Sequence, residues 1–181
     1  MAKRDKKSIT LGSGRIYIVE YEDTLPSVDE ICVDDNILGY IKGGAALEYT
    51  QKPYEEKDDL GLASKIIVTT EEALLKCGLL TWNGKTLQYL VDRCGVTEAD
   101  GKRITKIGGA GNAQGKDWAI CFFHEDKKDG NLWVLLRGQN TGGITLTFST
   151  EEGTVVEPEF KALPHDTDGT LIQLIEEMDA A

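Results

Sequence analysis

Apolar residues along this chain fall mainly into short runs separated by polar and glycine-rich segments, and in some of these runs apolar and polar positions alternate. In the run 144–148, for instance, isoleucine, leucine and phenylalanine alternate with two threonines. Alternation with a period of two places the apolar side chains on one face of a β-strand. Short strands separated by glycine-rich turns predict a sandwich or a barrel. We expect such strands at residues 15–21, 103–107, 117–123, 132–137, 144–148 and 154–163.

The segments that follow the first predicted strand carry weaker signals. Residues 22–35 are rich in acidic side chains and contain a proline, which indicates a loop. Residues 36–54 have strand character interrupted by glycines, which fits a pair of strands with a bend or a bulge. The polar residues 52–61 predict a long exposed loop. Residues 62–77 fit either one long strand or a strand followed by a helix, and we favour the single strand.

One helix is predicted over about residues 84–94. Asn83 is a residue type that caps helix N-termini, and Gly95 is placed to end the helix. Between them, apolar residues recur at intervals of three and four positions and form one stripe: Leu87, Leu90, Val91 and Cys94. The last segment, residues 170–178, fits either a short strand or a final helix.

These patterns together predict a mainly β fold, a two-sheet β-sandwich or barrel-like structure with one flanking α-helix. We expect an N-terminal arm at residues 1–14, a single domain at residues 15–181, and a C-terminal extension from about residue 164. The length of 181 residues, with 40% apolar and 28% charged residues, is typical of a globular domain.

The charge of the chain limits the partners that it can bind. Lysine and arginine number 20 against 31 aspartates and glutamates, which gives a net charge of −11. A protein that grips nucleic-acid phosphates needs a basic face, so this balance argues against that class. Positive charge does gather in the N-terminal arm, where acidic surfaces of a partner would attract it. The arm carries Lys3, Arg4, Lys6 and Lys7.

No motif points to catalysis, a metal or a cofactor. The four cysteines form no Cys-x-x-Cys pair and there are only two histidines, which excludes a zinc site of the usual spacing. The glycine-rich residues 108–117 lack the spacing of a phosphate loop, and residues 165–169 lack that of a calcium loop. A lone histidine at a strand end, His124, is expected at the surface. We therefore expect reduced cysteines, no metal, no cofactor and no enzyme activity.

Four stretches of the sequence give it a family resemblance. They are residues 9–18 (ITLGSGRIYI), 39–49 (GYIKGGAALEY), 75–83 (LKCGLLTWN) and 160–172 (FKALPHDTDGTLI). In the order of these four stretches and in its total length, the chain resembles the major tail tube proteins of long-tailed bacteriophages and prophages. The resemblance implies a β-sandwich with a flanking helix, and hexameric rings that stack into a tube through which DNA passes during ejection without specific binding.

The resemblance also implies partners and a location. The expected partners are further copies of the chain and other tail proteins, such as the tape measure and the tail terminator. The expected location is the virion tail, preceded by the bacterial cytoplasm, and the sequence contains no apolar run of about 18 residues that would anchor it in a membrane. We expect the arm and the polar loop to contact neighbouring subunits. The residues concerned are Lys3, Arg4, Lys6, Lys7, Lys52, Tyr54, Glu55, Glu56, Asp58 and Asp59.

Two alternative functions remain open at this point. The same fold serves the tubes of contractile tails and of type VI secretion machines. A β-sandwich could instead bind a sugar or another ligand on exposed aromatic side chains, for which the candidates are Trp82, Trp118 and Trp133.

Overall fold

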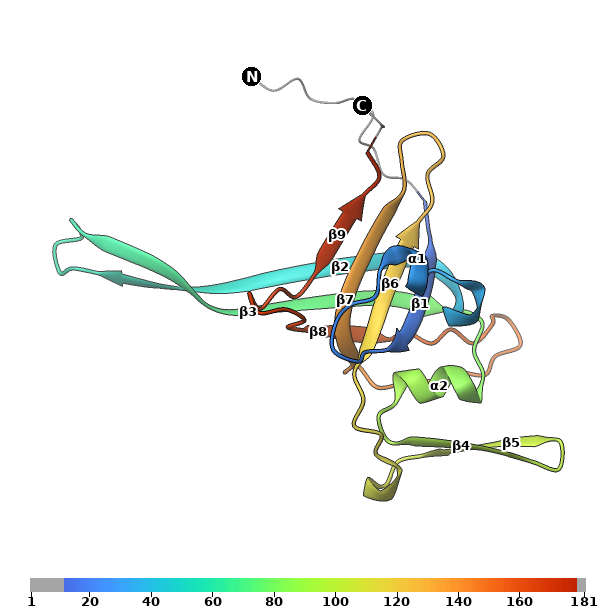
Figure 1. Cartoon of the computed structure of the whole chain (residues 1–181). Coiled ribbons are helices and arrows are strands. Elements are labelled where there is room, and N and C mark those ends of the chain that lie inside the picture. The colour runs from blue at the N-terminus through green and yellow to red at the C-terminus, as the bar shows by residue number, and fades with distance from the viewer. Residues whose placement is uncertain (1–11, 179–181) are drawn as a thin grey trace.

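The computed structural model describes residues 12–178, and about half of them lie in strands (Figure 1). The strands are β1 (Arg15–Glu20), β2 (Ile37–Lys57), β3 (Ser64–Leu79), β4 (Cys94–Ala99), β5 (Lys102–Ile107), β6 (Trp118–His124), β7 (Leu132–Asn140), β8 (Glu159–Leu163) and β9 (Gln173–Glu176). The helical turns are α1 (Val28–Ile31), η1 (Asp34–Asn36), α2 (Gly84–Leu90) and η2 (Ala110–Asn112). The mainly β fold expected from the sequence is confirmed.

Six strands close into an antiparallel barrel. They follow the order β6-β1-β2-β3-β8-β7, and β7 pairs again with β6 to complete the ring. The strand β9 pairs with the first half of β7, next to the part that pairs with β8. The hairpin of β4 and β5 forms a small separate sheet below the barrel in Figure 1. The strand pairing therefore matches the barrel-like form of the prediction.

The barrel strands bury side chains on two sides. In β1, Ile16 and Ile18 point into the barrel, where they join a core that contains Phe160. Tyr17 points the other way, into a second apolar cluster between the outer barrel wall and α1. β6 behaves in the same manner, which explains why its sequence is an almost continuous apolar run rather than an alternating one. Both β1 and β6 are therefore covered on two faces.

The predicted helix is real but shorter than expected. The Asn83 side chain caps it by accepting hydrogen bonds from the backbone N–H groups of Lys85 and Thr86. Leu87 and Leu90 are buried as predicted. The helix ends at Leu90, however, and residue 94 begins β4 instead of closing the apolar stripe.

A turn after β4 explains the early end of the helix. Asp100 and Gly101 both have positive φ angles, 51° and 70°, and they join β4 directly to β5. Asp-Gly at the two central positions favours a tight hairpin turn whose twist matches the flanking strands. This hairpin places residues 94–99 in a strand, so the prediction that the helix reaches Cys94 and ends at Gly95 was wrong.

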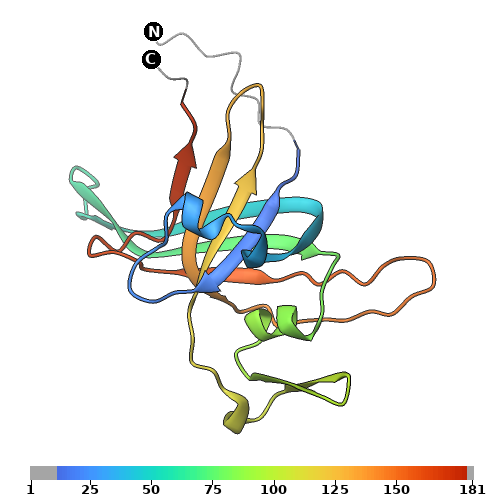
Figure 2. The same ribbon diagram turned by 45° about the vertical axis from the view of Figure 1, so that its right-hand side comes forward.

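Three other expectations need correction. Residues 144–148 are not a strand, although Ile144 and Leu146 pack against the barrel core. Their segment runs as a long loop on the side of α2 (Figure 2). Both edges of β8 and β7 are already paired, so these two strands offer residues 144–148 no free edge. Residues 22–35 contain α1 and part of η1 rather than a loop alone, and of the strand predicted at residues 154–163 only Glu159–Leu163 is a strand. The strand β9 is the short strand that was one of the two alternatives for residues 170–178.

Candidate functional site

The most conspicuous feature of the molecule is a long β-hairpin that leaves the barrel. β2 and β3 stay paired from Ala45 opposite Cys77 to Lys57 opposite Ser64. Beyond the barrel wall the hairpin projects as a free two-stranded ribbon (Figures 1 and 2). Every residue from 46 to 71 is exposed. The ribbon therefore lies outside the packed body along most of its length.

The hairpin corrects two expectations about residues 36–61. These residues form one strand rather than two, with a bulge at Gly43 and Gly44, both of which have positive φ angles. The predicted loop at residues 52–61 is strand up to Lys57, so only the following turn is a loop. The single strand favoured for residues 62–77 is confirmed, with its bounds at Ser64 and Leu79.

Asp58 holds the turn at the tip of the hairpin. Its backbone N–H donates to the carbonyl oxygen of Ala63 at 3.0 Å, and its carboxylate Oδ1 accepts from the N–H of Ala63 at 2.7 Å. The second bond lowers the pKa of Asp58. The Gly61 N–H donates to the Asp58 carbonyl oxygen at 2.9 Å, and Gly61 has a φ angle of 68°. Asp58, expected to contact a neighbouring subunit, thus has a structural role in its own chain.

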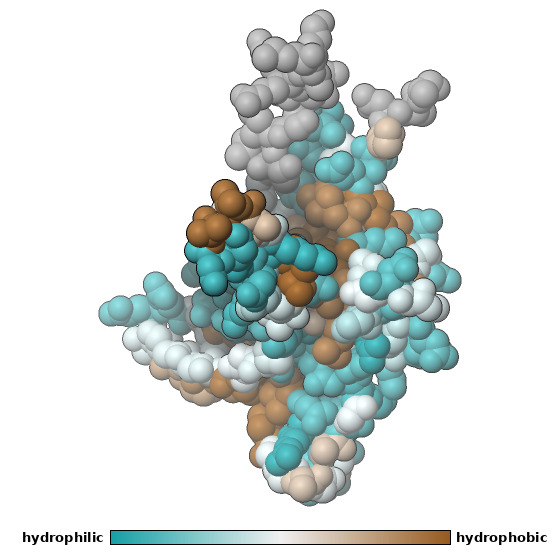
Figure 3. Space-filling view, turned by 90° about the vertical axis from the view of Figure 1, so that its left-hand side faces the viewer, coloured by the Kyte–Doolittle hydropathy of each residue, from teal (hydrophilic) through white to brown (hydrophobic). Residues whose placement is uncertain are grey.

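The exposed ribbon carries apolar side chains on both faces. Directly opposite residues share a face, so Pro53 and Val68 lie on one face, while Tyr54 and Ile67 lie on the other. About half of the Ile67 and Val68 side chains is exposed, 49% and 51% respectively. The side from which the hairpin projects shows brown apolar surface next to hydrophilic surface (Figure 3). Such a surface is unusual for a strand pair that faces water on both sides.

Two leucines extend this apolar surface to the tip. Leu60 is 79% exposed and Leu62 is 84% exposed, and they flank Gly61 in the turn. The sequence analysis did not select these leucines or the apolar residues of β3 as contact residues. The apolar run of β3 was visible in the sequence, but only the exposure of its side chains in the folded chain shows that neither of its faces is covered.

Charge at the distal end of the hairpin is mainly negative. Residues 55–59 contain four acidic side chains and one lysine, Lys57. Lys57 forms an ion pair with Glu55 at 3.2 Å, and the Tyr54 hydroxyl donates to Glu56. That hydrogen bond raises the pKa of Tyr54. Of the residues predicted as contacts, Lys52, Tyr54, Glu55, Glu56 and Asp59 are exposed on the ribbon or its tip. Lys3, Arg4, Lys6 and Lys7 lie outside the described residues.

The base of the hairpin is fixed to the barrel by ion pairs. Lys76 lies 3.0 Å from Glu48 and 3.7 Å from Glu159, which links β3 to β2 and to β8. Lys161 of β8 donates to Glu72 of β3 at 2.8 Å. The bond from Lys161 lowers the pKa of Glu72, and the bond to Glu48 raises the pKa of Lys76. A single exposed ion pair contributes little to the free energy of folding. Together, these ion pairs orient the point at which the ribbon leaves the barrel.

These contacts predict that the protein loses stability in acid. Glu72 has a folded-state pKa below its ordinary value of 4.5, so its contribution is present above that pH and is lost as the pH falls toward the folded pKa. Five other carboxylates also have lowered pKa values, so their contributions to stability are likewise lost in acid: Glu30, Asp58, Glu98, Asp126 and Asp166. Denaturant unfolding at about pH 6 and about pH 3.5 will show the loss. Glu72→Gln should be less stable than the wild type near pH 6 and should lose less stability than the wild type when the pH falls. An acid-induced loss equal to that of the wild type would contradict the role assigned to Glu72.

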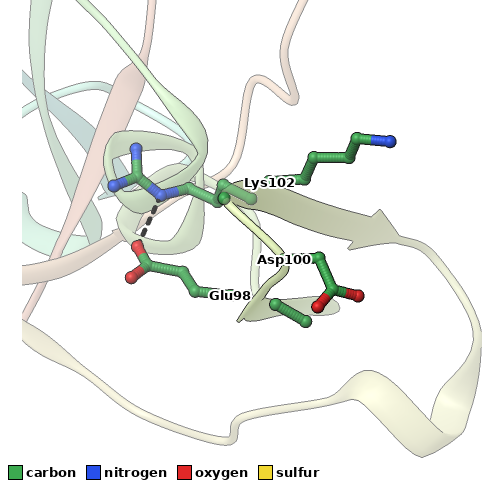
Figure 4. A pocket seen from close by; sticks show the side chains of 6 residues that line it. Glu98, Asp100 and Lys102 are labelled. Atoms are coloured by element: carbon green, nitrogen blue, oxygen red, sulfur yellow. Dashed lines mark hydrogen bonds and ion pairs between the residues drawn. The ribbon is translucent and has the colours of Figure 1, made fainter.

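The second hairpin offers a surface of the opposite charge. Arg103 and Glu98 pair at 2.9 Å on one face of β4 and β5, the face that lies against the start of α2. Lys102 and Lys106 lie on the other face with Ile104 between them. Lys102, which lines the hollow at the turn, points away from Glu98 (Figure 4). Neither lysine has an ion pair within residues 12–178.

The tryptophans do not form a binding platform. Trp118 is buried and packs edge-on against Tyr89, with ring centroids 4.8 Å apart. Trp133 stacks on Phe123 at 5.3 Å, and the Trp82 indole N–H donates to the carbonyl oxygen of Thr154 at 3.2 Å. Each indole is thus engaged by its own chain, and Trp82 and Trp133 remain partly exposed.

His124 lies inside the fold and not at its surface. His124 is buried rather than exposed as predicted, and its Nδ1 atom hydrogen-bonds with the carbonyl oxygen of Ser13 at 2.8 Å. Across residues 12–178, no three histidine, cysteine or acidic side chains gather in a group that could hold a metal. No helix within the same residues is long and apolar enough to cross a membrane. No known family model matches the sequence, and no curated protein matches it.

Proposed function

We propose that this protein is a structural subunit that assembles with copies of itself, and that the long hairpin is its main assembly element. The observation that carries the proposal is the ribbon of residues 46–71, which is exposed throughout and apolar on both faces. An isolated two-stranded hairpin is at best marginally stable in water. A covering partner would remove this apolar surface from water and fix the ribbon in one orientation.

A second copy of the chain supplies a matching surface. The acidic end of the long hairpin and the basic face of Lys102 and Lys106 both combine charge with exposed apolar side chains. The two hairpins project toward opposite sides of the barrel (Figures 1 and 2). Contact between two different surfaces of identical subunits builds a ring if the rotation closes, and a filament if it does not. Rings that stack through such contacts form a tube.

The tube that we propose is a bacteriophage tail tube, in keeping with the resemblance in the sequence. Its subunits would form stacked rings, contact other tail proteins at the two ends, and conduct DNA in the virion tail. The net charge of −11 supports this role, because an acidic wall repels phosphates and lets DNA slide without binding. A barrel with rigid walls and projecting hairpins suits a subunit that must be identical at every position of a tube.

Reversing the charge of the basic face tests the assembly contact. We expect the purified protein to form rings or tubes, seen by size exclusion and negative-stain microscopy. Lys102→Glu with Lys106→Glu should reduce assembly at least about tenfold, because like charges then face each other. Lys127→Glu with Lys128→Glu makes the same charge change in the β6–β7 turn and is the matched control.

The outcomes separate the contact from a general charge effect. Adding Glu55→Lys and Asp59→Lys to the variant that carries glutamate at positions 102 and 106 should restore assembly, because the pair is then complementary again. Equal loss in the control variant would show that net charge alone matters. A wild-type protein that stays monomeric at every concentration and salt condition would overturn the proposed function.

A further inference from the structure

Two cysteines that are distant in the sequence lie side by side on the outer wall of the barrel. The Sγ atoms of Cys32 and Cys121 are 3.7 Å apart, although 89 positions separate the residues. Cys32 follows the last residue of α1, and Cys121 occupies the middle of β6. A disulfide needs about 2 Å between the sulfur atoms, so a small movement of the α1 end would bring them within bonding distance.

The two cysteines of the pair differ in how deeply they are buried. Cys121 is fully buried in the outer apolar cluster, together with Tyr17, Ile31 and Leu135. Cys32 is only half-buried, so a small molecule from solvent can reach it first. The thiol–thiol hydrogen bond lowers the pKa of Cys32 and raises that of Cys121. The accessible sulfur is therefore also the one that ionises more easily, as a reactive cysteine requires.

We propose that Cys32 and Cys121 are an oxidation site at which a peroxide produces an intramolecular disulfide. The Cys32 thiolate attacks one oxygen of hydrogen peroxide, the O–O bond breaks, and the leaving hydroxide takes up a proton as water. The sulfenic acid left on Cys32 is then attacked by the Cys121 sulfur. The S–S bond forms, the S–O bond breaks, and the Cys121 proton leaves with the hydroxyl group as a second water. Two thiols are oxidised by two electrons and one peroxide is reduced to two waters.

The disulfide would fasten the segment of α1 to the barrel. This segment has a single helical turn of four residues, and the buried Ile31 is its main apolar anchor. A covalent link to β6 would prevent local opening of the segment and would restrict the unfolded chain through a large loop. Cys77 and Cys94 are buried apart from this pair and are free, which makes them internal controls. The inference rests on the distance and the burial of the pair and not on the proposed assembly.

Peptide mapping of the full chain after peroxide treatment tests the site. The protein is treated with hydrogen peroxide, alkylated under denaturing conditions, digested without reductant and analysed by mass spectrometry. We expect one cross-linked peptide pair that contains Cys32 and Cys121 and has lost two hydrogen atoms, while Cys77 and Cys94 carry the alkyl label. Reductant should separate the pair, and the oxidised protein should melt at a higher temperature than the reduced one.

Two variants identify the order of the steps. In Cys121→Ser, Cys32 should stop at the sulfenic acid and react with a dimedone probe, whereas Cys77→Ser should form the disulfide as the wild type does. Irreversible oxidation of Cys32 in the wild type with Cys121 still alkylated would overturn the proposal, and so would a cross-link between two chains. The peptide map of the wild-type protein needs no substitution, so it tests the disulfide even if one of the variants fails to fold.

Discussion

Replacement of residues 51–71 by an Asn-Gly turn is expected to give a folded protein that no longer assembles. Thr50 and Glu72 are directly opposite each other in the ladder, so a two-residue turn can join the strands at this point. The residues removed are all exposed, whereas the barrel core begins at Ala73 and Leu75. The change should therefore remove the contact surface and leave the packing of the barrel intact.

The measurements separate folding from assembly. Denaturant unfolding should remain one cooperative transition, while size exclusion and negative-stain microscopy should show monomers in place of rings or tubes. A second variant, Ile66→Thr with Ile67→Thr and Val68→Thr, keeps the length and the β-propensity of the ribbon but removes its apolar side chains. It should assemble at least about tenfold more weakly than the wild type. Normal tubes from both variants would exclude the hairpin as the assembly element.

Phe160→Ala is expected to have the largest effect on stability. Phe160 is fully buried in β8, the strand that joins β3 to β7 and so helps to close the barrel. Removing a buried phenylalanine side chain loses its transfer free energy and leaves a cavity, which costs about 3–5 kcal/mol. Denaturant unfolding of the dilute protein measures this loss without a contribution from assembly.

Phe148→Ala is the matched control for that prediction. Phe148 has the same side chain but is 79% exposed, in the segment that the alternating pattern wrongly assigned to a strand. Its removal should change the free energy of unfolding by less than about 0.5 kcal/mol. Equal losses in the two variants would mean that residues 144–148 pack as a strand after all, and would contradict the barrel closure described above.

Local signals in the sequence determined the elements whose neighbours are close along the chain. Asn83 starts a helix because its own side chain satisfies the N–H groups of the first turn. The glycines at positions 43 and 44 produce a bulge because they adopt positive φ angles that other residues avoid. The apolar runs of β1, β6 and β7 predicted strands correctly, because strands covered on both faces need apolar residues throughout.

Features that depend on distant partners were decided only by the tertiary structure. An alternating run becomes a strand only where an edge is free, and β7 and β8 left none for residues 144–148. The polar residues 52–57 became a strand because β3 offered them a partner, not because of their own composition. The candidate site follows the same rule. The acidic residues of the hairpin were visible in the sequence, but the exposure of Ile66, Ile67 and Val68 was not, because a pattern shows which residues are apolar and only the fold shows whether anything covers them.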